Sequence, residues 1–296
     1  MANENAETGR TLKGLAFVSP WIIGFVVFTA VPVGLSLYYS FCDYSLTLPP
    51  VFTGLDNYRT LMGDSIFWIS VRNTAYYAVL VLPLSLITAL GIAMLLNNKI
   101  RGLSIYRTIV FLPSLVPAVA AAMLWLWLFN AKLGLINVGL RAIGISEPPA
   151  WLADPNWSMP ALVLMSLWGV GNTVVIYLAG LQDVPRELYE AADIDGATPI
   201  RKIWHVTLPS ISPVIFFNLI MGIIGTLQVF SQAYIITAGG PARSTTFYTM
   251  YLYDNAFVNL RMGYASAMAW IQLLVILALT LLATWSSKKW VHYGGK

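Results

Sequence analysis

The chain alternates long apolar runs with short polar stretches. An α-helix needs about 20 consecutive apolar residues to cross the hydrocarbon core of a bilayer. Six runs reach this length, so the pattern predicts an all-α membrane protein with six transmembrane helices. The runs are Leu15–Phe41, Thr74–Leu96, Ile105–Phe129, Met159–Gly180, Ile211–Ile236 and Tyr264–Trp285.

The first run begins like a signal peptide, because Arg10 and Lys13 precede it. It is too long for the apolar region of a signal peptide, however, and no small-residue cleavage pattern closes it. We therefore expect an uncleaved first transmembrane helix over residues 15–41, preceded by a cytoplasmic tail over residues 1–14.

The positive charges in the loops predict the orientation of the chain in the membrane. Cytoplasmic loops of membrane proteins carry an excess of Lys and Arg. With the amino terminus placed inside, 11 of the 17 Lys and Arg residues fall on inside segments and six fall outside. We therefore expect both termini in the cytoplasm, a five-helix core domain over 71–285 with an inside loop over 181–210, and a tail over 286–296.

The composition agrees with a membrane protein. Hydrophobic residues make up 58% of the chain and charged residues 10%, whereas soluble domains carry about 25% charged residues. The single cysteine, Cys42, cannot form an intramolecular disulfide, and His205 and His292 have no partner at metal-ligand spacing. The net charge of +4 comes from basic residues in short loops, so it indicates topology and not nucleic-acid binding.

Charged residues are nearly absent from the predicted spans. Arg107, at the cytoplasmic edge of the third span, is the one charged residue within them. Proton-coupled carriers typically use an intramembrane carboxylate or histidine, so this class is disfavoured, whereas sodium coupling through backbone carbonyls stays open. The chain also lacks the G-x-x-x-x-G-K-[ST] phosphate-binding loop, so active transport would need energy from a partner protein.

The inside loop over 181–210 carries five of the chain's 13 acidic residues and predicts two short helices. Pro185 fits the first position of the first helix, because a proline there loses no hydrogen bond. Gly196 allows the left-handed turn that ends many helices. Thr198 and Pro199 then fit the cap and the first position of the second helix.

The same loop contains Glu-Ala-Ala, three residues, Gly, nine residues and then Val-Thr-Leu-Pro. This spacing resembles the "EAA" loop of ABC importer permeases, with valine in place of the usual isoleucine. In that family the loop is the coupling helix that inserts into the ATPase subunit. The resemblance therefore implies the type I ABC importer permease fold, and an ATPase-coupling role for Glu190, Ala191, Ala192, Gly196, Leu208 and Pro209.

Further stretches resemble carbohydrate permeases of the maltose-transporter type, in particular the first of their two non-identical permeases. These stretches are Phe111–Pro117, Leu133–Asn137, Thr237–Pro241 and Gly263–Ala265. The resemblance covers the whole chain, but the extra amino-terminal spans and the large external domain of the maltose permease are missing. The resemblance therefore does not imply that the substrate is maltose.

Polar and aromatic residues within the spans are the candidates for contacting a sugar, although such polar side chains also join membrane helices together. The fifth span offers Asn218, Phe230 and Gln232 among them. Gly169 and Gly222 match cavity positions of the maltose-type permease, where they would make room for the substrate. The residues predicted to bind substrate are Ser114, Trp168, Asn172, Thr226 and Gln228. The first four match positions that line the sugar cavity of the maltose-type permease.

The resemblance implies a permease subunit that moves a carbohydrate across the cytoplasmic (inner) membrane of a bacterium or archaeon. The expected partners are a second homologous permease in a heterodimer, a dimeric ABC ATPase, an extracytoplasmic sugar-binding protein, the sugar and the bilayer, without nucleic acid. This chain is not expected to be an enzyme or to bind a cofactor, since ATP and Mg²⁺ would bind the ATPase.

Three alternatives stay open. A permease of the same fold for glycerol phosphate or a polyamine is one, although a phosphorylated solute should prefer cationic cavity residues, which the middle of the spans lacks. A sodium-coupled secondary carrier would show uptake without ATP or partners. A scaffold that transports nothing would leave the polar residues of the fourth and fifth spans without a purpose.

Overall fold

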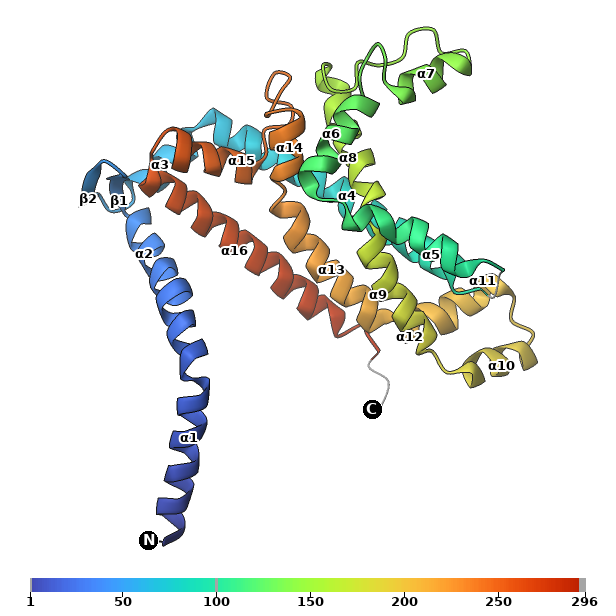
Figure 1. The fold of residues 1–296 in the computed structure, drawn as a ribbon, viewed down its shortest axis with the longest axis horizontal. Helices are drawn as coiled ribbons and strands as arrows, with labels where there is room; N and C mark the ends of the chain where they lie inside the picture. Colours follow the sequence, from blue (N-terminus) through green and yellow to red (C-terminus); the bar gives the residue numbers. More distant parts are fainter. Residues whose placement is uncertain (1, 99–100, 293–296) are drawn as a thin grey trace. The chain divides into compact units, whose positions relative to one another are not determined.

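The computed structural model describes residues 2–98 and 101–292, with side chains from Gly14 onward. It is almost entirely helical (Figure 1). The fold divides into two compact units: unit 1 combines Met1–Asp64 with Leu252–Gln272, and unit 2 combines Ser65–Tyr251 with Leu273–Lys296. Helices α15 and α16 each contribute residues to both units.

Unit 1 contains the first helical run, a short β-hairpin and the beginning of α16. Its elements are α1 (Ala2–Phe25), the π-helical turn η1 (Val26–Ala30), α2 (Val31–Ser40), β1 (Cys42–Ser45), β2 (Leu48–Phe52), α3 (Asp56–Gly63), the π-helical turn η4 (Asp254–Val258) and the first part of α16 (Met262–Ser287).

The first helical run is unbroken from α1 to α2 and is apolar over Gly14–Ser40. Its backbone is helical from Ala2 onward, so the segment expected as a tail over residues 1–14 continues the helix. Phe17 and Phe28 are among its most exposed side chains. An apolar helix surface of this kind suits contact with lipid or with another membrane helix.

A hairpin closes the end of α2. Its antiparallel strands pair Cys42 with Phe52. From α3, the Asn57 Nδ2 group donates hydrogen bonds to the carbonyl oxygens of Ser40, at 3.0 Å, and Cys42, at 2.8 Å. These two bonds tie α3 to the junction of α2 and β1.

The beginning of α16 packs against the same hairpin. A Cβ atom on Gly263 would lie 2.1 Å from the carbonyl oxygen of Cys42, so the two backbones are in close contact. The buried Tyr264 hydroxyl donates a hydrogen bond to the carboxylate of Asp64. Close backbone approach is what small residues allow between membrane helices.

Unit 2 contains the remaining elements. They are α4 (Ser65–Leu96), α5 (Leu103–Phe111), the 3₁₀ turn η2 (Leu112–Leu115), α6 (Ala118–Leu128), α7 (Leu135–Ala142), α8 (Pro155–Trp168), α9 (Gly171–Gln182), α10 (Arg186–Ile194), α11 (Pro199–Lys202), the π-helical turn η3 (Ile203–Thr207), α12 (Leu208–Ser210), α13 (Ser212–Leu227), α14 (Ser231–Ile236), most of α15 (Tyr248–Tyr253) and the end of α16.

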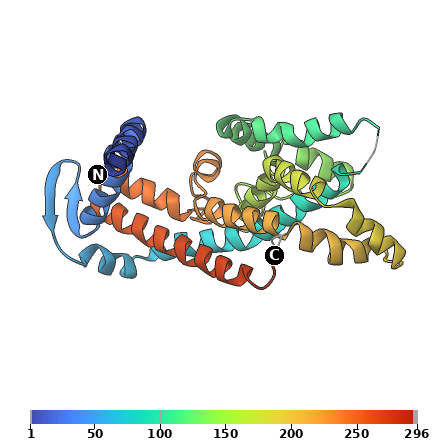
Figure 2. The same cartoon turned by 90° about the horizontal axis from the view of Figure 1, so that it is seen from below.

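Helix α4 is the centre of unit 2 and packs against α8, α9 and α13 (Figure 1 and Figure 2). It begins at Ser65 and not at Thr74, the expected start of the second span. Phe67 and Ser70, in the additional turns, are buried. Packing therefore extends the helix beyond its most apolar stretch.

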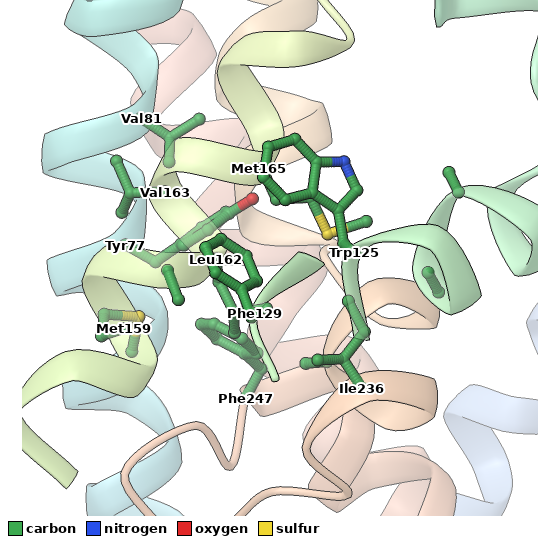
Figure 3. Close-up of a cluster of buried hydrophobic side chains, with 14 of the residues drawn as sticks. Tyr77, Val81, Trp125, Phe129, Met159, Leu162, Val163, Met165, Ile236 and Phe247 are labelled. Carbon is green, nitrogen blue, oxygen red and sulfur yellow. The ribbon is translucent and has the colours of Figure 1, made fainter. Parts of the chain in front are cut away.

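Two clusters of buried apolar side chains hold these helices together. One joins α4, α6, α8 and α14 and includes Tyr77, Trp125 and Phe247 (Figure 3). The other joins α4 and α9 and includes Ala93 and Tyr177. Side chains from segments far apart in the sequence thus share both clusters.

Two of the expected spans are bent. The α5–η2 segment and α6 meet at 100°, and α8 and α9 meet at 45°. At the sharper bend, Val116 precedes Pro117 and has an extended backbone with ψ of 127°. A residue before proline disfavours helical angles, which explains why the helix stops there.

The loop after α14 is tied to α4 within unit 2. The side-chain amide of Asn73 donates to the carbonyl oxygens of Arg243, at 2.8 Å, and Thr246, at 3.1 Å. The Thr74 hydroxyl oxygen accepts a bond from the backbone N–H of Tyr248 at 2.9 Å. This loop contains the expected Thr237–Pro241 stretch and is held in one position against α4.

Four segments of the described chain are long and apolar enough to cross a membrane. The count rises to six if each bent pair is one span, which agrees with the six expected spans. The expected tail 286–296 is described only as far as His292. The four straight segments are Gly14–Ser40, Ser65–Leu96, Ser212–Ile236 and Met262–Ser287.

The contact at Gly263 makes a stability prediction. Gly263→Ala should lower the free energy of unfolding by about 1–3 kcal/mol, because the new methyl group meets a backbone oxygen that cannot rotate away. The matched control is Gly91→Ala in α4, where a Cβ would have no neighbour within 4 Å. Thermal unfolding in detergent should separate the two variants, and equal midpoints would contradict the close contact.

Candidate functional site

The segment between α9 and α13 folds into the predicted helix–turn–helix (Figure 1). Gly196 makes the turn in the left-handed region, with φ of 70°. The N–H of Ala197 donates to the carbonyl of Ala192 at 2.9 Å and ends α10 in the usual manner of such turns. Thr198 then caps α11, its hydroxyl oxygen accepting from the N–H of Arg201 at 3.4 Å.

The predicted start of the second helix at Pro199 is confirmed, whereas the predicted start of the first helix is shifted by one residue. Pro185 lies just before α10, with ψ of 135°, and the helix begins at the next residue. Pro209 lies inside a helical run that continues from α11 through η3 and α12, so this proline does not stop the helix.

Two side-chain contacts lock the two halves of this loop together. The Tyr189 hydroxyl and the Thr207 hydroxyl are hydrogen bonded at 3.0 Å. The Lys202 ammonium group forms an ion pair with the carboxylate of Asp193. Because Asp193 is largely exposed, this ion pair contributes little to stability.

A groove of about 530 Å³ runs between the two halves. Its lining combines small and apolar side chains with charged ones. Ile194, Ile200 and Trp204 on the same loop are exposed by 87%, 69% and 65%. Such a surface is typical of a protein-binding site. The groove is lined by Leu188, Ala191, Ala192, Asp195, Ala197, Arg201, Lys202, His205 and Val206.

The residues expected to couple to an ATPase all belong to this loop. Glu190, Ala191 and Gly196 are exposed, and Ala192 is half-buried in the groove. Leu208 and Pro209 are half-buried where the loop joins α13. The loop therefore presents the first four residues outward and uses the last two at its base.

A separate cavity of about 400 Å³ lies within unit 2, near the junction of α13 and α14. This volume is in the range of small-molecule sites. Its described lining contains hydroxyl, amide and aromatic side chains and no charged one. The lining is Tyr77, Val81, Ser85, Ala118, Ser166, Gly169, Val170, Thr173, Gly222, Gly225, Thr226, Val229, Phe230, Ser231 and Gln232.

Three of the six hydroxyl groups in the described lining already donate their hydrogens. Ser85, Ser166 and Thr226 each donate to a carbonyl oxygen three or four residues earlier in their own helix, at 2.6–3.0 Å. By contrast, Thr173 and Gln232 make no such bond within the part of the chain that the structure describes. These two side chains are therefore available to a ligand.

The described residues contain no group of three or more His, Cys, Asp or Glu side chains that could hold a metal ion. Neither the loop nor the cavity has the nucleophile and base of a catalytic site. What the geometry offers is a docking surface at one end of unit 2 and a cavity without charges.

Residues 81–292 match the family described as binding-protein-dependent transport system inner membrane components. The chain belongs to this family. It is a multi-pass membrane subunit of a transport system and not an enzyme.

Individual relatives agree over nearly the full length of this permease. The probable ABC transporter permease protein YesP of Bacillus subtilis is 42% identical and covers 96% of this chain and 93% of its own. The sulfoquinovosyl glycerol transport system permease protein SmoG of Agrobacterium fabrum is 35% identical, and the match covers 94% of this chain and 90% of SmoG.

A solved structure shows the same fold. It is a bacterial alginate ABC transporter in complex with an alginate pentasaccharide-bound periplasmic protein. One of its chains matches this permease with a TM-score of 0.84 and 25% identity, over 96% of each chain. The predicted type I ABC importer permease fold is therefore confirmed.

The structure brings only one of the five predicted substrate residues of this permease into the cavity. Thr226 lines it, as do Gly169 and Gly222. The other four lie outside the lining: Ser114 donates to the carbonyl of Phe111 at 2.7 Å, Trp168 packs edge-on against Trp125, and Asn172 and Gln228 are exposed.

Several cavity residues were not among the predicted substrate residues. Tyr77 and Ser85 come from α4, which sequence reasoning did not consider as a cavity wall. Thr173 follows the predicted Asn172 directly on α9 and lines the cavity, whereas Asn172 does not. Gln232 was noted as a polar residue of the fifth span and does line the cavity.

The hydrogen bond between Tyr189 and Thr207 predicts a local effect. Tyr189→Phe should lower the free energy of opening the loop by about 0.5–1.5 kcal/mol, because the Thr207 hydroxyl loses this hydrogen-bond partner. Hydrogen exchange measured by mass spectrometry should rise over residues 186–207 and stay unchanged in α4. Tyr106→Phe, on an exposed tyrosine of α5, is the control. Unchanged exchange in the loop would show that the bond does not hold it.

Proposed function

We propose that this permease translocates a carbohydrate. The cavity of about 400 Å³ carries the proposal, because its described lining combines hydroxyl and amide groups with the aromatic ring of Phe230 and contains no charge. Sugars offer many hydroxyl groups and an apolar ring face. The hydroxyl and amide groups of the lining can bond the first, and the aromatic ring can pack against the second. The Phe230 ring is stacked on Tyr234 at 5.1 Å between centroids, which restricts its motion.

Similarity to known transporters supports this substrate class. SmoG is named for sulfoquinovosyl glycerol, and the matching solved transporter is described with alginate. Both names refer to carbohydrate ligands.

Charged solutes are the rival substrates within the same fold. Glycerol phosphate or a polyamine would need opposite charges or several donors in the pathway, because an unpaired ion is costly to move out of water. The described lining of this cavity supplies no such charge. A sodium-coupled carrier that works alone is disfavoured, because the family is that of binding-protein-dependent systems.

The proposed assembly contains four kinds of subunit. This permease would pair with a second, homologous permease, and a dimeric ABC ATPase would bind the loop over Leu181–Ser210. An extracytoplasmic binding protein would deliver the sugar, as the periplasmic protein in the alginate complex suggests. With the amino terminus inside, 11 Lys and Arg residues lie on inside segments and six lie outside. This excess supports a position of the loop and both termini on the cytoplasmic side of the inner membrane.

Alternating access explains how the two regions cooperate. When the ATPase closes on ATP, it would pull on the loop, and α11, η3 and α12 would transmit the motion because they run directly into α13. Helix α13 carries Gly222 and Thr226 of the cavity. The loop and the cavity are therefore joined by one nearly continuous helical path.

The coupling role predicts a loss of assembly. Glu190→Ala should lower ATPase binding by about ten-fold or more, as expected when one partner of a buried polar contact is removed. Gly196→Trp should act similarly, since it puts a bulky L-residue at a φ of 70°. Co-purification of the ATPase and sugar uptake in vesicles measure both effects.

Two controls make this test specific. Glu187→Ala removes an exposed carboxylate from the same helix, and Gly196→Asn tolerates the left-handed turn. Membrane levels of all variants should match the parent protein. If Glu190→Ala and Gly196→Trp both assembled and transported normally, the coupling role would be wrong.

The cavity predicts a change in substrate affinity. Gln232→Ala should raise the KM for sugar uptake about three- to ten-fold, because one neutral hydrogen bond is lost. Gln228→Ala, on the exposed glutamine four residues earlier, should leave KM unchanged. Uptake by the reconstituted complex is measured with neutral oligosaccharides, glycerol 3-phosphate and putrescine. Transport of only the charged solutes would refute the carbohydrate proposal.

A further inference from the structure

A second groove, of about 390 Å³, lies along the outside of α5, η2 and α9 in unit 2. It is separate from the substrate cavity and shares no lining residue with it. Helices α5 and α9 lie side by side here. They approach closely because Gly171 faces the backbone of Val110 and Phe111, where a Cβ would come within 3.1 Å.

One end of this groove contains Arg107. Its Nη2 atom donates to the carbonyl oxygen of Leu96 at 3.2 Å, at the end of α4. Its Nε atom is buried and has no hydrogen-bond partner. No carboxylate of the described residues lies within salt-bridge distance of Arg107.

The position of this arginine is costly unless an anion meets it. A buried N–H without an acceptor costs about 1–3 kcal/mol, and more when the group is charged. Ionisable residues within membrane helices are usually paired for this reason. Arg107 is the one charged residue of the six expected spans, so no carboxylate of the spans can pair with it.

The rest of the groove is apolar and leads away from the arginine. Leu112 and Leu115 form one wall, and Val174 and Val175 form the other. A chain of methylene groups would bury apolar surface along this path, which is worth about 0.8 kcal/mol per methylene. The groove thus combines a cationic end with an apolar channel.

We propose that this groove binds an anionic phospholipid, with the phosphate on Arg107 and one acyl chain between α5 and α9. The planar guanidinium group matches the oxygen atoms of a phosphate. Leu178, which lines the same groove, lies close to the end of α9 that leads into the loop over residues 181–210. Basic pockets between membrane helices at the cytoplasmic side are known to bind acidic lipid head groups.

The test uses the assembled transporter in nanodiscs that contain equal amounts of dioleoylphosphatidylglycerol and dioleoylphosphatidylcholine. Native mass spectrometry after release should show phosphatidylglycerol retained on the complex in preference to phosphatidylcholine. Arg107→Gln should lower this retention about five-fold or more, the effect expected of one arginine near an acidic lipid.

Two further variants separate the groove from general surface charge. Arg101→Gln removes the same charge from an exposed position in the turn before α5 and should retain the lipid. Val175→Phe fills the channel and leaves Arg107 intact, so it should reduce retention as Arg107→Gln does. Elution of each complex as a single peak shows that the variants are folded.

Three outcomes would overturn the proposal. The first is equal retention by the parent protein and the Arg107→Gln variant. The second is equal loss in the Arg101→Gln variant, which would indicate attraction to the surface only. The third is a crosslink from a photoreactive residue at position 112 to the second permease, which would show that a subunit covers the groove. None of these results depends on the transported solute.

Discussion

Close packing of α4 against α9 and α13 is the constraint on which unit 2 depends. A Cβ on Gly222 would lie 2.4 Å from Leu82, and one on Gly180 would lie 2.7 Å from Val214. Membrane helices gain little hydrophobic energy from associating in lipid, so close approach at small residues holds them together. Gly222 also lines the substrate cavity. The residue that brings two helices together thereby opens space beside their contact.

Much of the architecture follows from local sequence. Apolar length predicts the spans, because each must satisfy its backbone hydrogen bonds within the membrane. Glycine and proline spacing predicts the turn at Gly196 and the start of α11 at Pro199, since these features depend on neighbouring residues only. The early start of α4 was not predicted, because it depends on the packing of Phe67 and Ser70, which hydropathy does not report. The 100° bend at Val116, by contrast, has a local cause in the proline that follows it.

The cavity was harder to predict than the loop for the same reason. Ser114 and Trp168 have suitable chemistry, but the first bonds its own helix and the second packs against Trp125. Asn172 and Thr173 are adjacent and differ only in the face they occupy. Polar character identifies the helices that contribute to a cavity. The rotation of each helix, which decides the actual lining, is set by long-range packing.

The hydrogen bonds of the cavity hydroxyls have a consequence for selectivity. Because Ser85, Ser166 and Thr226 give their hydrogens to their own helices, their oxygens face the cavity mainly as acceptors. These three acceptors favour a solute rich in O–H donors over the lone pairs of a phosphate or carboxylate. At these positions the dipoles of the lining disfavour anions without any charged residue of the described lining.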